Sequence, residues 1–203
     1  MNKRKGLFVT FEGPNGVGKS TLMDEVVAQL RKKKLKTLKT KEPTQSSLGQ
    51  FIRSAEELYQ GRPLACLVAA DRYFHLENEI LPALDNGKVV ISDRYVESSL
   101  VLQRFDGLKI EDIWTLNQKI CVPDLSIILT ASPETLNQRL KDRVRKSRFE
   151  RTESRAQELR YYLEAGEFLK QQGFNVIFIE NDSILIEENV GFIVQQILSL
   201  MQS

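Results

Sequence analysis

The chain has 203 residues, a length that suits a single domain, residues 1–203, with a buried core. It carries 29 basic against 27 acidic residues, so no strongly cationic surface argues for a nucleic-acid partner. One histidine, His75, and two distant cysteines, Cys66 and Cys121, give no metal or redox spacing. There is no apolar run of about eighteen residues and no signal-like apolar region after Met1, so we expect a cytoplasmic protein without membrane contact.

The first predicted elements are a strand over residues 6–12, a glycine-rich loop and a helix. Residues 13–20 match the spacing G-x-x-x-x-G-K-S, which in this context is typical of a phosphate-binding loop. Backbone N–H groups of such a loop surround phosphate oxygens, and the helix N-terminus adds its positive dipole end. Lys19 is expected to reach the β- and γ-phosphates, and the Ser20 hydroxyl to bind magnesium. The residues predicted to bind ATP are Gly13, Pro14, Asn15, Gly16, Val17, Gly18, Lys19, Ser20 and Thr21.

Strands and helices alternate along the rest of the chain. In chain order we predict a strand at 35–41, helices at 48–58 and 64–84, strands at 88–92 and 125–129, helices at 134–145 and 152–171, a strand at 175–179 and a helix at 184–201. This order predicts an α/β fold of three layers, a five-stranded parallel sheet with helices on both faces. The ligand should bind at the carboxyl ends of the strands, where the loop, Pro43 and Asp93 fall.

The loop alone does not identify the kind of triphosphate-binding protein. Transporter-type ATPase domains need a Leu-Ser-Gly-Gly-Gln signature and GTPases need Asn-Lys-x-Asp, and both are absent from the sequence. Instead, Asp93 and Arg94 end the third predicted strand, and arginines are frequent between Arg139 and Arg160. A carboxylate at this strand end can hold magnesium, and Arg94 offers a planar fork for a second, acceptor phosphate. The arginine-rich stretch can close over a transferring phosphoryl group.

The chain resembles thymidylate kinases in segments that occur in the family's order. They are Phe11-Glu-Gly with Gly18-Lys-Ser-Thr21, Lys41-Glu-Pro43, Ala70-Asp-Arg72, Asp93-Arg-Tyr-x-x-Ser98 and Arg148-Phe-Glu150. The resemblance implies the P-loop kinase fold with an arginine-rich lid at about residues 141–155. It also implies transfer of the γ-phosphoryl of ATP to dTMP for dTTP synthesis, with Mg²⁺ and usually in a homodimer.

The same resemblance assigns roles to individual residues. Arg72 would hydrogen-bond the thymine edge, and Arg94 would bind the acceptor phosphate. The implied catalytic residues are Lys19, Asp93, Arg94, Arg143 and Arg148, and the implied metal ligands are Ser20 and Asp93. The implied acceptor-binding residues are Glu12, Asn15, Pro43, Val68, Arg72, Arg94, Ser98, Ser99 and Leu102.

Three positions on the acceptor side depart from the family pattern. Val68 stands where the family usually stacks thymine on phenylalanine, Asn15 where a carboxylate commonly binds the 3′-hydroxyl, and Leu102 where an aromatic ring often crowds the 2′ position. Another pyrimidine nucleotide therefore competes with dTMP as the acceptor. Glu12 also leaves a deoxynucleoside kinase open, because it could act as a base near a 5′-hydroxyl, and a non-catalytic ATP-binding module is a third alternative. We expect His75 to be a core or interface residue rather than a catalytic one.

Overall fold

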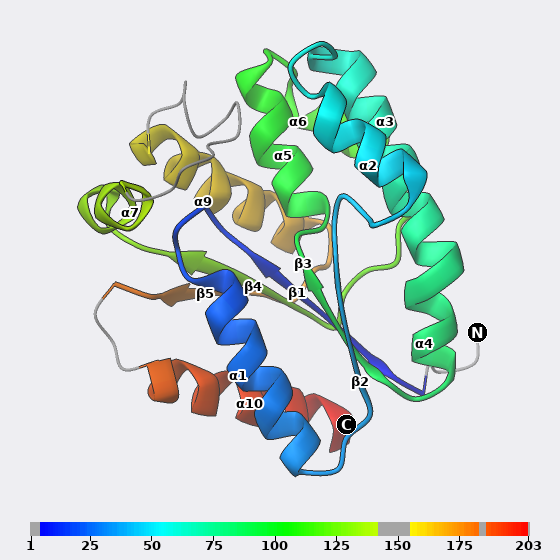
Figure 1. Cartoon of the computed structure of the whole chain (residues 1–203), viewed down its shortest axis with the longest axis vertical. Coiled ribbons are helices and arrows are strands. Elements are labelled where there is room, and N and C mark those ends of the chain that lie inside the picture. Colours follow the sequence, from blue (N-terminus) through cyan, green and yellow to red (C-terminus); the bar gives the residue numbers. More distant parts are fainter. Residues whose placement is uncertain (1–4, 142–154, 183–185, 203) are drawn as a thin grey trace.

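A computed structural model describes residues 5–141, 155–182 and 186–202, and these residues form a three-layer α/β structure (Figure 1). Its parallel sheet has the strand order β2-β3-β1-β4-β5. The strands are β1 (Leu7–Glu12), β2 (Thr37–Lys41), β3 (Val89–Asp93), β4 (Leu125–Thr130) and β5 (Val176–Glu180). All four pairings are parallel, so the carboxyl ends of all five strands meet at one edge. The predicted fold class is confirmed.

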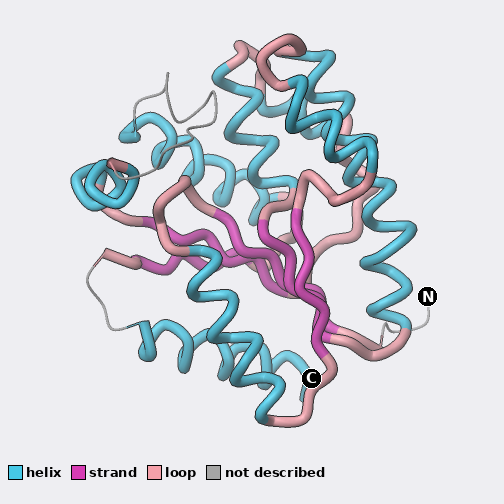
Figure 2. Tube along the Cα trace, in the orientation of Figure 1, coloured by secondary structure: helices cyan, strands magenta, loops and turns pink. Residues whose placement is uncertain are grey.

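Helices cover both faces of the sheet because the strand side chains alternate between two apolar cores. Val9 and Ile91 face one core, which is closed by α1 (Lys19–Lys32) and α10 (Ile186–Gln202). Phe8 faces the other core, which is closed by α4 (Leu81–Asp85), α5 (Val96–Phe105) and α9 (Arg155–Gln171). Figure 2 shows the strands enclosed between these two helical layers.

Helices α2 (Ser47–Ala55) and α3 (Gly61–His75) pack against each other beyond the carboxyl ends of β2 and β3 (Figure 1). Helix α6 (Ile110–Thr115) packs against α5, and α7 (Pro133–Leu140) follows β4 on the other side of the sheet and packs against α9. A π-helical turn, η1 (Leu76–Ile80), connects α3 to α4. In the part of the chain that the structure describes, no helix is long and apolar enough to cross a membrane.

The structure corrects several predicted boundaries. The helix predicted at 64–84 is α3, η1 and α4 in succession, and the helix predicted at 48–58 ends at Ala55. The sequence reading assigned no helix between residues 93 and 124, whereas α5 and α6 lie there. The hydrophobic pattern does not predict α5, because this helix is buried along nearly its whole length and its polar residues face inward. It therefore has no amphipathic period. The last residues of the helix predicted at 134–145 lie outside the described residues.

Candidate active site

The predicted phosphate-binding loop connects β1 to α1 at the carboxyl edge of the sheet. Gly13 has a φ of 130°, and a Cβ atom there would lie 2.4 Å from the Leu129 carbonyl oxygen, so only glycine fits. Gly18 caps α1 in the left-handed region, with a φ of 98°. Lys19 Nζ donates hydrogen bonds to the carbonyl oxygens of Gly13 (2.7 Å) and Pro14 (3.0 Å). The lysine therefore folds back along the loop, with its ammonium group against these two carbonyl oxygens.

Two asparagines, one after β5 and one on α10, stabilise the phosphate-binding loop through hydrogen bonds. Asn181 Nδ2 donates a hydrogen bond of 2.7 Å to the Val17 carbonyl oxygen. Asn189, on α10, donates to Asn181 Oδ1 at 3.1 Å and fixes the orientation of that amide. The sequence reading missed both residues, because the contact joins segments that are more than a hundred residues apart in the chain.

Arg94 follows β3 directly and contacts both the loop and α5. Its Nη2 donates to Asn15 Oδ1 at 2.6 Å, and its Nη1 donates to Ser98 Oγ at 2.8 Å and to the Tyr162 hydroxyl at 3.1 Å. The backbone of Arg94 has a φ of 74°, which is the left-handed region. A residue other than glycine costs of the order of 1–3 kcal/mol there, and such strain clusters at functional sites.

Glu12 lies buried beneath Arg94 at the end of β1. Its carboxylate accepts hydrogen bonds from the Tyr95 backbone N–H and from Ser98 Oγ, the latter at 2.6 Å. Burial and the neighbouring Glu97 raise the pKa of Glu12 to about 8, although Arg94 opposes the shift. Burial and Arg94 lower the pKa of Lys19 to about 7. Glu12 and Lys19 thus flank the phosphate-binding loop, and the pKa of each depends on Arg94.

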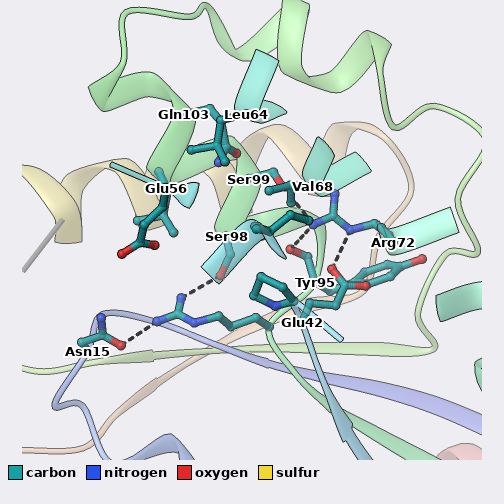
Figure 3. A pocket seen from close by; sticks show the side chains of 14 residues that line it. Asn15, Glu42, Glu56, Leu64, Val68, Arg72, Tyr95, Ser98, Ser99 and Gln103 are labelled. Atoms are coloured by element: carbon teal, nitrogen blue, oxygen red, sulfur yellow. Dashed lines mark hydrogen bonds and ion pairs between the residues drawn. The ribbon is translucent and has the colours of Figure 1, made fainter. Parts of the chain in front are cut away.

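A pocket of about 210 Å³ opens beside Arg94 (Figure 3). One wall is aliphatic, from Ile52, Leu64, Val68 and Leu102, and the other wall is polar. Its lining residues are Asn15, Glu42, Pro43, Ile52, Glu56, Leu64, Val68, Arg72, Arg94, Tyr95, Ser98, Ser99, Leu102 and Gln103. The pocket therefore brings together all the predicted acceptor residues except Glu12, which lies below it. A slot with one apolar wall and a polar edge suits a flat heterocycle attached to a phosphate.

Arg72 is held rigidly in this pocket, and Figure 3 shows its contacts with Glu42, Tyr95 and Ser99. It is 1% exposed, and its Nε donates to Glu42 Oε2 at 2.9 Å. Its Nη1 donates to Asn117 Oδ1 at 2.6 Å, and its Nη2 donates to Ser99 Oγ and to the Tyr95 carbonyl oxygen, both at 2.9 Å. These bonds use four of the five guanidinium N–H groups. Within the described residues, one N–H on Nη1 remains for a ligand.

Gln103 is a pocket residue to which the sequence reading gave no role. It is 3% exposed, and its Oε1 has no hydrogen-bond partner among the described residues. A buried amide oxygen without a partner is costly unless a ligand satisfies it. Sequence reasoning also missed Ile52, Glu56 and Leu64, because nothing local distinguishes these positions from ordinary helix residues.

A second, more polar cavity of about 500 Å³ is lined by Ser20, Lys39, Thr40, Lys41, Gln45, Glu79 and Asp93. The predicted metal ligands Ser20 and Asp93 therefore face the same space. Asp93 Oδ1 is buried and has no hydrogen-bond partner in the part of the chain that the structure describes. Those residues contain no cluster of three or more metal-binding side chains. This donor set fits Mg²⁺, which takes one or two protein oxygens and completes its shell with phosphates and water.

The predicted lid residues Arg143 and Arg148 lie outside the described residues.

The fold and the strand–loop–helix phosphate site define a P-loop nucleotide kinase. A family model described as thymidylate kinase matches residues 11–190. A thymidylate kinase of Caldicellulosiruptor saccharolyticus is 43% identical over 145 residues, which are 68% of this chain and 70% of that protein. A probable thymidylate kinase of Thermococcus gammatolerans is 34% identical over an alignment of 207 positions. The alignment covers 96% of this chain and 99% of that protein. The chain belongs to the thymidylate kinase family.

Proposed function

We propose that the chain transfers the γ-phosphoryl group of ATP to dTMP, giving ADP and dTDP for dTTP synthesis. The observation that carries this proposal is the position of Arg94. Its guanidinium touches the phosphate-binding loop through Asn15 and the acceptor pocket through Ser98. A phosphate held there lies beside the γ-phosphate site, which is the arrangement that phosphoryl transfer requires.

The polar edge of the pocket can recognise a pyrimidine. The remaining N–H of Arg72 can donate to a base carbonyl oxygen, and Gln103 Oε1 can accept from a ring N–H. Thymine carries both groups. Val68 and Leu102 supply the apolar surface against which the base and its methyl group pack.

On the donor side, we propose that loop residues 13–21 hold the triphosphate of ATP. An oxygen of the acceptor phosphate attacks the γ-phosphorus, the bond from that phosphorus to the β–γ bridging oxygen breaks, and ADP leaves. Lys19 would stabilise charge on the transferring group, and Arg94 would hold the attacking phosphate in line. We assign Mg²⁺ to Ser20 and Asp93, where it would neutralise charge on the β- and γ-phosphates. Arg143 and Arg148, at the lid proposed for residues 141–155, would add positive charge.

We also propose that the 203 residues act as one domain in a cytoplasmic homodimer with no nucleic-acid partner. The location is that of its substrates, ATP and deoxynucleotides. Phe74, on α3, is 47% exposed and gives this helix the kind of apolar surface that a partner helix covers.

An ADP-release assay over a panel of nucleosides and nucleoside monophosphates tests the proposal. We expect dTMP to have the highest kcat/KM, and Lys19→Ala, purified in parallel, to show that the activity belongs to this chain. Faster turnover on thymidine than on dTMP would replace the proposal with a nucleoside kinase. Faster turnover on another pyrimidine monophosphate would show that this nucleotide, and not dTMP, is the preferred acceptor.

A further inference from the structure

His75, the chain's only histidine, is buried among polar groups. It is 1% exposed and ends α3, three residues after Arg72. Both ring nitrogens have polar neighbours, Glu42 on one side and Thr40 with Glu79 on the other. A histidine that merely fills space does not need this many partners.

Glu42 joins His75 to Arg72. Its Oε1 lies 3.2 Å from His75 Nδ1, and its Oε2 accepts from Arg72 Nε at 2.9 Å. Because a carboxylate only accepts hydrogen bonds, His75 Nδ1 must carry a hydrogen in this contact. The two donors fix the orientation of the Glu42 carboxylate between them, and that carboxylate in turn fixes the tilt of the guanidinium that faces the pocket.

The other ring nitrogen points toward the second cavity. His75 Nε2 lies 2.8 Å from Thr40 Oγ1 and 3.2 Å from Glu79 Oε2, and the Thr40 hydroxyl donates to Glu79 at 2.9 Å. Glu79 belongs to the π-helical turn η1, a kind of distortion that is frequent at functional sites. The ring is thus anchored on the side away from Glu42.

We propose that His75 is a positioning residue for base recognition, acting on Arg72 through Glu42. This inference rests on the proposed function. With Nδ1 donating to Glu42, the guanidinium presents its remaining N–H toward the base, and the pocket selects a pyrimidine with a carbonyl oxygen over one with an amino group at that edge. Loss of the contact leaves the Glu42 carboxylate held by Arg72 alone, so its orientation is less fixed and this selection weakens.

Two substitutions separate the two sides of the ring. His75→Asn keeps an amide N–H near the position of Nδ1 and loses the contacts with Thr40 and Glu79. His75→Gln places its amide near the position of Nε2 and loses the contact with Glu42. Both remove the ring and differ from each other by one methylene group, so each serves as a control for the other.

We expect His75→Gln to raise the KM for dTMP about tenfold, the size expected for one hydrogen bond to a charged group. Its kcat and its KM for ATP should stay within about threefold of wild type, and its preference for dTMP over dCMP should fall by a similar tenfold factor. His75→Asn should retain both the KM and the preference. Equal effects in the two variants, or a lower melting temperature with unchanged KM and preference, would overturn the proposal.

A wild-type measurement keeps the test independent of how the variants fold. Since the chain has one histidine, its imidazole ¹⁵N resonances belong to His75. We expect the Nδ1 resonance to show a bound hydrogen, both alone and with dTMP, whereas an Nδ1 without hydrogen would refute the contact with Glu42. Wild-type turnover on dTMP tests the proposed function separately, because the ¹⁵N measurement does not depend on activity.

Discussion

Arg94 Nη2 donates a hydrogen bond of 2.6 Å to Asn15 Oδ1, and this bond connects the acceptor pocket to the phosphate-binding loop. One residue follows β3 and the other lies between β1 and α1, and these two strands are neighbours in the sheet. The sheet therefore sets the distance between the two proposed phosphate sites. Such alignment of reactants is a large part of what an enzyme contributes to phosphoryl transfer.

Replacing Lys19 should depress turnover far more than acceptor binding. Its ammonium group is expected to meet charge that develops on the transferring phosphoryl group, so Lys19→Ala should lower kcat about 10²–10³-fold. Steady-state kinetics and dTMP titration calorimetry measure the two effects. Lys32→Ala, at the far end of the same helix, serves as the control and should behave as wild type. Near-normal kcat in Lys19→Ala would remove the lysine from the mechanism.

Chelation of divalent cations should abolish turnover, and Asp93→Asn should raise the Mg²⁺ concentration needed to restore it. The substitution keeps the shape of the side chain but removes the charge of the carboxylate, whose Oδ1 has no hydrogen-bond partner among the described residues. We expect the midpoint of the Mg²⁺ titration to rise about 10–100-fold. Glu79→Gln removes a charge from the same cavity without touching the proposed ligands, and it should leave the midpoint unchanged. An unaltered midpoint in Asp93→Asn would exclude Asp93 as a ligand.

Sequence patterns indicate those parts of the proposed site that lie within short, continuous segments. The phosphate-binding loop lies within one continuous segment, and Arg72 and Arg94 lie in short motifs. The support for these residues could not be read in the same way. Glu42 meets Arg72 across 30 residues, and Asn117 meets it across 45. Such contacts depend on how α3, α5 and α6 pack together, and the hydrophobic period of one segment does not carry that information.

Val68→Phe tests whether the aliphatic wall suits thymine. Val68 is half-buried and lines the pocket. If thymine packs there, a ring should improve dTMP affinity by about 0.5–1.5 kcal/mol, which titration calorimetry resolves. Cys66→Phe adds a ring at an exposed position of the same helix and should leave the affinity unchanged. Weaker dTMP binding in Val68→Phe would mean that the wall is fitted to a different occupant, since overfilling a packed site costs about 1–3 kcal/mol.

Glu12 should make the folded state less stable as the pH rises. Burial and Glu97 raise the pKa of Glu12 from an ordinary 4.5 to about 8, so between these values the folded state binds more protons than the unfolded state. The free energy of unfolding therefore falls with increasing pH in this window, by up to about 1.4 kcal/mol per pH unit. Glu12→Gln should flatten the dependence.

Denaturant unfolding of wild type and Glu12→Gln between about pH 5 and 6.5 measures the difference. This range avoids Lys19, whose pKa is lowered from 10.5 to about 7 and which works in the opposite direction above that value. Glu97, whose pKa burial also raises, is present in both proteins. Parallel curves for the two proteins would show that Glu12 binds no extra proton in the folded state.

The left-handed backbone conformation of Arg94 implies a trade-off between catalytic activity and thermal stability. Glycine adopts this conformation without strain, so Arg94→Gly should relieve part of the backbone cost and raise the melting temperature. The same change deletes the guanidinium that we propose holds the acceptor phosphate. A screen that selects only for thermal tolerance would therefore favour inactive proteins at this position. Directed evolution of a more thermostable variant should keep residue 94 unchanged and select stabilising substitutions at other positions.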